Sequence, residues 1–255
     1  MINNRIEYQR MYEAERKLWW YQVLHRKILL QITNHFKVFN PRLKILDAAC
    51  GTGGLLSFLK EKGYHNISGF DFSEHAIDFS LARDLDVSFG DLKNVNAFRP
   101  DETFDVICCN DALYFLTDTE IISALKIFRK RLNKDGIILI NIHAFEAFSG
   151  THDLAVGSSR RFTFEDFEVY LGLVNLNVKY KTYWPFLLSL PIWLVRIWQR
   201  RQIRKENLST ATPDSDVSYP GNFINSLLLR MMSLEETIFH TAPFGSSLFM
   251  VLKEK

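Results

Sequence analysis

The chain has 255 residues, of which 47% are hydrophobic and 24% are charged. This is the usual mixture of a globular protein, and the chain is long enough to bury a sizeable core. Its formal net charge of +2 gives no global reason to expect a polyanionic partner, so no nucleic acid is expected as a ligand.

The first ten residues, MINNRIEYQR, are polar and of mixed charge. They lack the apolar run and the small-residue cleavage site of a signal peptide, so we expect a cytoplasmic protein. Cys50, Cys108 and Cys109 fall in or beside predicted buried strands, with no CxxC pair and no histidine at metal-ligand spacing. We interpret them as reduced, packed thiols and expect no metal.

Helical and strand patterns alternate along the first 145 residues. Residues 6–38 are predicted to form a helix, which Pro41 separates from the first predicted strand. Further helices are predicted over 55–63, 73–84 and 119–136, and strands over 43–49, 66–72, 86–91, 104–111 and 136–142. This alternation predicts a parallel sheet with right-handed crossovers, in which ligands bind beyond the carboxyl ends of the strands.

The stretch DAACGTGG comes directly after the first predicted strand. Gly51 and Gly53 can adopt positive φ and present no Cβ, so a bulky ligand can lie directly on the chain. Leu56 occupies the place of the third glycine in the dinucleotide fingerprint, which makes a dinucleotide the weaker interpretation. A P-loop is excluded, because no Lys-Ser or Lys-Thr pair comes after the glycines.

The stretch LDAACGTGG resembles the first motif of the class I S-adenosylmethionine-dependent methyltransferases. The resemblance implies that Asp47 orients the amino end of the cofactor. It also implies that the main chain at Ala49, Gly51 and Gly53 lines the rest of that part of the site. Ala49 stands where the family usually has a glycine.

Later strand ends extend this resemblance. GFDFS places Asp71 where the family's acid accepts both ribose hydroxyls, with Phe72 packing on adenine. FGDLKN places Asp91 and Leu92 where an acid and a backbone N–H contact the adenine. FDVICCNDALYFL, which includes Asn110, resembles the motif beneath the methyl group. A single Asp is more often a cap or turn residue, but three at successive strand ends favour cofactor binding.

The stretch MYEAERKLWWYQVLHRKI resembles the N-terminal helix of a bacterial methyltransferase subgroup that is often associated with polysaccharide, glycolipid or secondary-metabolite biosynthesis. SGTHDLAVGSSRRF resembles a second segment of that subgroup. The resulting acceptor-binding candidates are Glu15, Trp19, Trp20, Tyr114, Arg160 and Arg161. Each has a structural alternative, because tryptophans on a helix are more often core or interface and arginines can bridge to nearby acids.

A hydroxyl acceptor must lose a proton during methyl transfer, and an imidazole suits this task near neutral pH. His152 is the first candidate base, because it lies with Asp153 in the Gly-flanked loop beyond the fifth predicted strand. His143, which closes that strand, is the second, and Asp153 is the candidate orienting partner. The family's common Glu-His pair is replaced by Tyr114 and Phe115, which would line the pocket with aromatic rings.

Residues 184–205 combine three tryptophans with a basic cluster of Arg196, Arg200, Arg201, Arg204 and Lys205. The apolar part of the segment is shorter than the roughly 20 residues that span a bilayer, and prolines interrupt it. Two interpretations stay open. The segment is either an interfacial anchor, which would place the protein at the inner membrane surface, or a helical lid over the acceptor pocket or in a dimer.

Together these patterns predict one α/β domain over residues 1–255, with a Rossmann-like seven-stranded methyltransferase sheet and helices on both faces. Its parts are an N-terminal helical cap (1–40), a cofactor-binding core (41–145), an acceptor-side loop, helix and lid (146–240) and a final strand (241–255). The predicted function is S-adenosylmethionine-dependent O-methylation of a sugar, glycolipid or lipophilic small molecule. The alternatives are N- or C-methylation of a secondary metabolite, a non-catalytic cofactor-binding module and a membrane-peripheral module.

Overall fold

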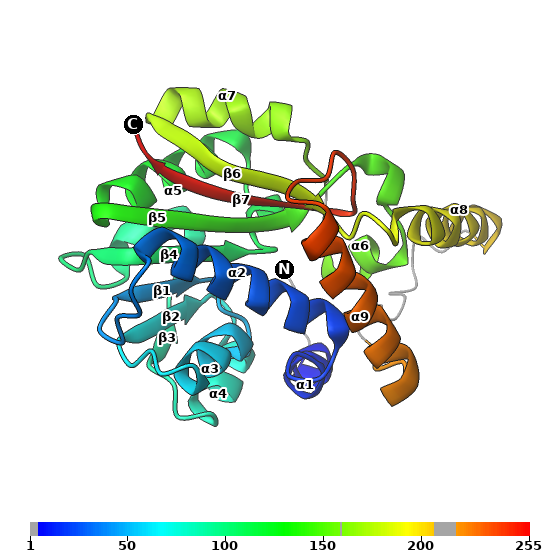
Figure 1. Ribbon diagram of the computed structural model, residues 1–255, viewed down its shortest axis with the longest axis horizontal. Coiled ribbons are helices and arrows are strands. Elements are labelled where there is room, and N and C mark those ends of the chain that lie inside the picture. Colours follow the sequence, from blue (N-terminus) through cyan, green and yellow to red (C-terminus); the bar gives the residue numbers. More distant parts are fainter. Residues whose placement is uncertain (1–4, 159, 207–217) are drawn as a thin grey trace.

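A seven-stranded sheet forms the centre of the computed structural model, which describes residues 5–158, 160–206 and 218–255, without the side chains of 204–206 (Figure 1). The strand order is β3-β2-β1-β4-β5-β7-β6, and β7 runs antiparallel to both of its neighbours. This confirms the predicted α/β fold. The strands are β1 Ile45–Ala48, β2 Ile67–Asp71, β3 Val87–Phe89, β4 Phe104–Asn110, β5 Leu132–His143, β6 Leu176–Trp184 and β7 Ser247–Glu254.

Helices cover both faces of the sheet, as predicted (Figure 1). Along a strand, successive side chains point to opposite faces, so Cys108 of β4 packs with one core cluster and Cys109 with the other. The first cluster includes residues of α2 and α3, and the second includes residues of α5 and α7. The helices are α1 Arg5–Ala14, α2 Trp19–Phe36, α3 Gly54–Glu61, α4 Glu74–Leu81, α5 Asp118–Lys130, α6 Thr151–Val156, α7 Phe164–Val174, α8 Ser189–Glu206 and α9 Asn222–Ile238, with short 3-10 turns at η1 Leu92–Ala97, η2 Leu113–Phe115 and η3 Glu146–Phe148.

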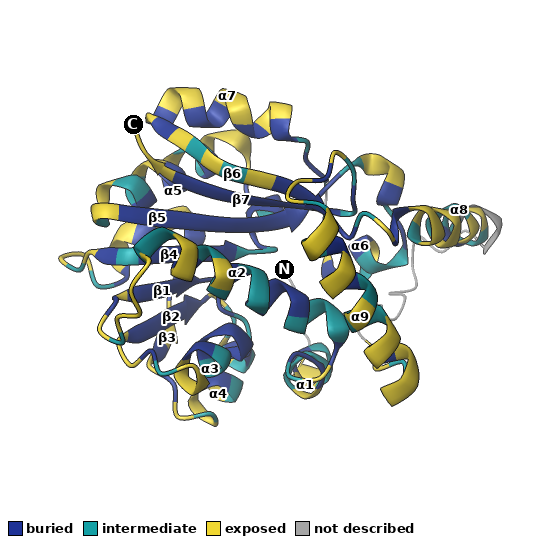
Figure 2. Ribbon diagram, viewed as in Figure 1, coloured by how far each residue is buried: buried dark blue, intermediate teal, exposed yellow. Residues whose placement is uncertain are grey.

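Strands β1 and β2 are buried along their whole length, the outer strands β3 and β6 are partly exposed, and the helices expose their outer faces to solvent (Figure 2). All three cysteines are buried and unpaired, as the strand predictions require. Within the described ranges, no helix combines the length and the apolar character that a membrane span needs.

The single helix predicted over 6–38 is wrong, because the chain breaks between α1 and α2. Leu18 is extended, with φ −68° and ψ 131°, and the N–H of Trp19 donates to Asn225 Oδ1 at 2.7 Å. This contact comes from α9, more than 200 residues away, so local helix propensity could not reveal it. The fifth strand also begins earlier than predicted, at Leu132, because the preceding helix α5 ends at Lys130.

Candidate active site

A cavity of about 910 Å³ lies at the carboxyl ends of the parallel strands. This volume is large enough for a cofactor together with a small acceptor. Helices α1, α2, α8 and α9 also contribute to its walls, so segments from both ends of the chain close over the sheet edge. Strands β1 to β5 each bring a residue at or just beyond the strand end, namely Asp47, Asp71, Asp91, Asn110 and His143.

The glycine-rich turn between β1 and α3 forms one wall of the cavity. Ala49, Gly51 and Gly53 have φ of 62°, 55° and 77°, so the turn passes repeatedly through the left-handed region. Ala49 and Gly51 line the cavity. Gly53 does not line it, because it faces away from the cavity: a Cβ there would come within 2.5 Å of Leu85. The packing of the turn therefore requires a glycine at position 53, and the predicted contact of its main chain with the cofactor stays a prediction.

Replacing Ala49 with glycine is expected to stabilise the fold. An alanine in the left-handed region costs about 1–2 kcal/mol, of which the entropy of a new glycine in the unfolded chain offsets about half. Denaturant titration should show a free energy of unfolding higher by about 0.5–1 kcal/mol. Ala48→Gly is the matched control, because Ala48 lies in β1 and should only lose stability. An equal loss in both variants would contradict strain at Ala49.

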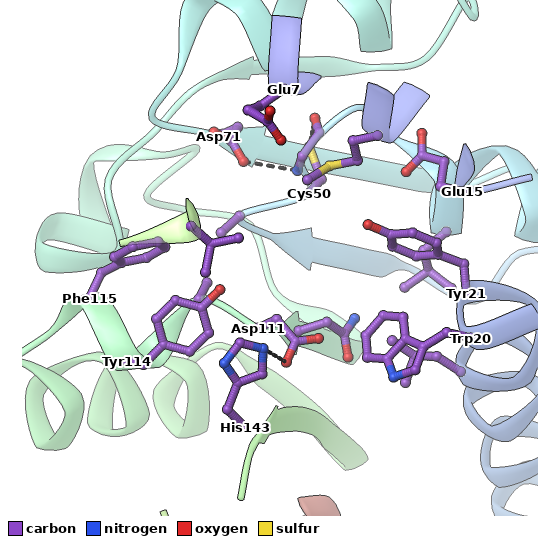
Figure 3. Close-up of a pocket in the computed structure, with 18 of the residues that line it drawn as sticks. Glu7, Glu15, Trp20, Tyr21, Cys50, Asp71, Asp111, Tyr114, Phe115 and His143 are labelled. Atoms are coloured by element: carbon purple, nitrogen blue, oxygen red, sulfur yellow. Dashed lines mark hydrogen bonds and ion pairs between the residues drawn. The ribbon is translucent and has the colours of Figure 1, made fainter. Parts of the chain in front are cut away.

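The three predicted acids converge on the same cavity. Burial raises the pKa of Asp47 well above its usual range, and nearby Asp71 and Glu15 add to the rise. Asp71, labelled in Figure 3, accepts hydrogen bonds from the N–H of Gly51 on Oδ2 and of Ser73 on Oδ1, both at 2.9 Å. Asp91 accepts from the N–H of Lys93 at 2.9 Å. Asp71 thus braces the glycine turn as well as facing the cavity.

Two aromatic rings extend the cofactor side of the cavity outward. Phe72 and Phe89 have ring centroids 5.5 Å apart, and both side chains are largely exposed. A flat ring placed at this edge would find aromatic surface on the protein. Phe89 lies in β3 and was not among the predicted site residues. Its place in the cavity wall becomes visible only in the folded chain, where its ring lies beside that of Phe72. Leu92, which was predicted, also lines the cavity.

Asn110, at the end of β4, also lines the cavity. Its Oδ1 is buried and accepts no hydrogen bond from any residue that the structure describes. A buried acceptor without a donor is unfavourable by about 1–3 kcal/mol, so a ligand N–H or O–H here would relieve it. Asn110 therefore fits a site that a polar ligand completes.

His143 lies at the floor of the cavity between two carboxylates. Its Nε2 is 3.8 Å from Asp111 Oδ1, its Nδ1 is 3.7 Å from Asp153 Oδ1, and its ring stacks on Tyr114 with centroids 4.7 Å apart (Figure 3). Burial lowers the pKa of His143 well below its usual range, and nearby Arg161 contributes. The imidazole is therefore neutral at neutral pH, the form that a general base requires, and the lowered pKa means that a proton taken there needs a carboxylate beside it.

Asp111 is a site residue that the sequence patterns did not single out. It comes directly after Asn110 with φ 48° and accepts a hydrogen bond from Asn141 Nδ2 at 2.9 Å on Oδ2. Burial raises the pKa of Asp111 to about 7, although Asn141 and Arg161 both oppose the rise. Its position directly after the fourth-strand motif was the available signal, but its approach to His143 depends on the pairing of β4 with β5.

The two remaining catalytic candidates lie around His143. The rings of His152 and His143 are 5.5 Å apart, and His152 lines the cavity. Asp153 does not line it, since its carboxylate binds Arg161 through Nε at 2.8 Å and Nη2 at 3.0 Å. Arg161 also lines the cavity. His143 has a carboxylate near each ring nitrogen, at 3.7 and 3.8 Å, while its Nδ1 makes no hydrogen bond in the described residues; both histidines stay candidates for the base.

Glu15 reaches the cavity from the link between α1 and α2. Its buried carboxylate accepts a hydrogen bond from Thr52 and pairs with Arg83 Nη1 at 2.7 Å. It also lies over the start of α3, where a Cβ on Gly54 would come within 2.3 Å of it. Burial raises the pKa of Glu15 to about 7. These contacts indicate that Glu15 supports the glycine turn more than it reaches toward an acceptor.

Aromatic side chains face each other across the part of the cavity that holds His143. Trp20 and Tyr21 of α2 lie opposite Tyr114 and Phe115, with Asp111 and His143 between them (Figure 3). Trp20 also stacks on the buried Trp184, with centroids 5.3 Å apart. Trp19 lines the cavity as predicted, and Tyr21 is a lining residue that was not predicted.

Arg160, a predicted acceptor contact, does not line the cavity. Its guanidinium pairs with Asp118 and donates to the carbonyl of Leu116 at 2.9 Å, which are the structural contacts that the alternative describes, and its contact with an acceptor stays a prediction. By contrast, α8 places Ile192 and Arg196 against the cavity, as a lid would. Arg204 and Lys205 of the predicted basic cluster lie outside the side chains that the structure describes. The described residues hold no group of His, Cys, Asp and Glu side chains arranged for a metal ion.

Comparison with known proteins gives the family. A model of the family described as "Methyltransferase domain" matches residues 17–173, which is more than half of the chain. The chain belongs to this methyltransferase family. The matched part of the methyltransferase domain includes the glycine turn, the three acids, Asp111 and His143.

Individual relatives match over shorter stretches. A putative methyltransferase, YqeM, of Bacillus subtilis (strain 168) is 33% identical over 108 residues, which cover 40% of this chain and 42% of that protein. Phosphoethanolamine N-methyltransferase 1 of Zea mays is 30% identical over 135 residues, 51% of this chain and 26% of that protein. The methyltransferase chain thus covers less than half the length of either curated relative.

Solved structures share the fold. An S-adenosylmethionine-dependent methyltransferase from Clostridium acetobutylicum ATCC 824 aligns with a TM-score of 0.56 over 92% of both chains, at 14% identity. The alignment covers more of the chain than the part that the family model matches, so the likeness in fold extends beyond residues 17–173.

Proposed function

We propose that this chain transfers a methyl group from S-adenosylmethionine to a hydroxyl group on a largely apolar small molecule, such as a glycolipid or a lipophilic metabolite. The observation that carries the proposal is the place of His143. A neutral imidazole lies between Asp111 and Asp153 at the floor of a cavity whose other side holds the predicted cofactor acids. Family membership supports the reaction, and the geometry supports the oxygen acceptor.

The residues on the cofactor side fit S-adenosylmethionine. Asp71 would hold the ribose hydroxyls, Asp91 and Leu92 the adenine, and Asp47 the amino group of the methionine part. Asn110 offers a buried acceptor atom that lacks a donor in the described residues. The cofactor supplies an activated methyl group on a sulfonium, which is already a good leaving group.

The acceptor side favours an apolar molecule. The rings of Trp20, Tyr21, Tyr114 and Phe115 enclose the space above His143, and Ile192 of α8 adds an aliphatic wall. Such a surface binds apolar area and excludes water from the reaction. Holding two reactants in line at this place supplies most of the catalysis that a methyl transfer requires.

His143 would take the proton of the acceptor hydroxyl on Nε2, the ring nitrogen on the side of Asp111. Asp111 lines the cavity and would stabilise the imidazolium that forms. On the other side of the ring, Asp153 faces Nδ1 and is itself held by Arg161. Nδ1 has no hydrogen-bond partner among the described residues, and Asp153 Oδ1 lies 3.7 Å away, so Asp153 would act on the imidazole through its charge, without a hydrogen bond.

Calorimetry on the purified chain tests the cofactor assignment first. We expect micromolar binding of S-adenosylmethionine and S-adenosylhomocysteine and none of NADH, because the third glycine of the dinucleotide fingerprint is absent. Transfer of a labelled methyl group to a panel of lipophilic alcohols and amines then tests the acceptor. Methylation of amines alone would replace the hydroxyl assignment with N-methylation. Cofactor binding without transfer would favour the non-catalytic module.

A further inference from the structure

The outer face of α8 is apolar where a surface helix is normally polar. Leu190, Leu194 and Trp198 succeed one another at helical spacing and are all largely exposed, with Leu194 at 54% and Trp198 at 58%. Arg201 continues the stripe one turn further and is also exposed. Scattered exposed apolar residues need no explanation, but a continuous stripe does.

Helix α9 carries a second stripe of the same kind. Phe223, Leu227, Leu234 and Ile238 are exposed along one side of the helix, and Phe223 is 82% exposed. Arg230 lies within the stripe and is exposed too. Both helices extend from the same end of the molecule, away from the edge formed by β3 (Figure 1). Their exposed residues colour much of that end in Figure 2.

Among the described side chains, the exposed charge of these two helix faces has one sign. Residues 176–205 and 218–234 contain no Asp or Glu, although the chain has 29 acids; Glu206, Asp214 and Asp216 between them lie outside the described side chains. Two acids occur near the inner end of α9, and both are engaged: Glu235 is buried and accepts from the N–H of Leu187, and Glu236 pairs with Lys27 at 2.9 Å. The outer faces therefore offer aliphatic and aromatic side chains with arginines and no exposed carboxylate among the described residues.

We propose that the outer faces of α8 and α9 bind the surface of an anionic lipid bilayer. Tryptophan at the water interface, aliphatic residues inserted among acyl chains and arginines at the phosphate level are the composition that holds an interfacial helix. A second copy of the chain fits less well, because Arg201 and Arg230 of two copies would meet like charges. A bilayer with anionic headgroups is complementary to both kinds of side chain, because its acyl chains accept the apolar residues and its phosphates pair with the arginines.

The inner faces of the same helices connect this surface to the cavity. Ile192 and Arg196 of α8 and Leu228 of α9 line the cavity, while the opposite sides of both helices carry the exposed stripes. A lid whose outer face touches lipid would open the cavity toward the bilayer. The membrane contact itself does not depend on the identity of the acceptor or on catalysis.

Vesicle flotation tests the proposal with the whole chain. We compare vesicles of phosphatidylcholine alone with vesicles in which about a third of it is replaced by phosphatidylglycerol, and expect at least about tenfold stronger binding to the latter, weakened by high salt. Leu194→Gln and Trp198→Ala should each weaken binding by about fivefold or more. Arg201→Gln should weaken binding by about fivefold on the anionic vesicles only.

Two matched variants serve as controls. Leu173→Gln alters an equally exposed leucine on α7, at 60%, and Arg42→Gln an exposed arginine before β1; neither should change flotation. Each variant should keep the wild-type affinity for S-adenosylhomocysteine, so a loss of flotation can be separated from a loss of fold or of cofactor binding. Absence of flotation, or equal effects of Leu194→Gln and Leu173→Gln, would overturn the proposal. So would a dimer in sedimentation velocity that Leu194→Gln dissociates, which would assign the surface to a second copy.

Discussion

Replacing His143 with glutamine is expected to lower the turnover of methyl transfer by about 100- to 10,000-fold, the range that general-base catalysis contributes. Glutamine keeps a polar side chain at the end of β5 but cannot accept the acceptor's proton. The affinity for S-adenosylhomocysteine should stay within about twofold, because the product contains no group that His143 must deprotonate. Turnover is measured with labelled cofactor on an acceptor found in the screen, and affinity by calorimetry.

The pH profile gives this prediction a second readout. Asp111 faces His143, Asn141 and Arg161, and burial raises the pKa of Asp111 to about 7. Below that pH the carboxyl is protonated and cannot stabilise an imidazolium, so turnover should rise as the pH increases through about 7. Asp111→Asn should remove this limb of the profile and lower turnover at pH 8. A purely structural role would leave the limb in place.

The control for His143 is His65→Gln, because His65 is exposed and lies outside the cavity. His152→Gln separates the two histidine candidates. Full activity in His143→Gln together with an inactive His152→Gln would assign the base to His152. Full activity in both variants would show that the acceptor needs no histidine base. A neutral amine, or a phenol that is already ionised in solution, would be such an acceptor.

Replacing Asp71 with alanine is expected to weaken the binding of S-adenosylhomocysteine by roughly 5- to 150-fold, which corresponds to about 1–3 kcal/mol for a charge-assisted contact. Two losses combine in this variant. The ribose hydroxyls lose their acceptor, and the N–H of Gly51 loses the bond at 2.9 Å that braces the turn. Calorimetry on the purified variant measures their combined effect directly.

Asp71→Asn separates these two losses. The single amide oxygen can accept from Gly51 but not from Ser73 as well, so one of the two backbone bonds is kept while the charge is lost, and the affinity should fall between those of the wild type and Asp71→Ala. Asp101→Ala removes an exposed carboxylate outside the cavity and should change nothing. An unchanged dissociation constant in Asp71→Ala would remove Asp71 from the ribose site.

Most of the cofactor side could be predicted from the sequence because its signals are local. Each strand end carries its acid within a short motif, and the turn after β1 needs residues that tolerate positive φ. Asp47, Asp71 and Asp91 were therefore recognised, and all three line one cavity. Gly53 shows the limit of this reasoning, since a glycine in the same motif packs against Leu85 instead of facing the ligand space.

The acceptor side depended on contacts that no local pattern contains. Arg160 and Arg161 are adjacent in the sequence, yet one pairs with Asp118 at the surface and the other with buried Asp153 beside the cavity. Their side chains diverge because neighbouring residues of an extended segment point to opposite sides. Glu15 had a similar ambiguity, which its buried contacts with Thr52 and Arg83 resolve.

The sequence by itself determined the order of helices and strands, the ligand edge of the sheet and the acids that face it, because periodicity and turn chemistry act over a few residues. Only the tertiary structure decided that His143 meets Asp111 and Asp153, that the N-terminal helix breaks at Leu18, and that α8 covers the cavity with one face and exposes the other. These features join residues far apart in the chain, and their distances result from strand pairing and core packing, which no single segment encodes.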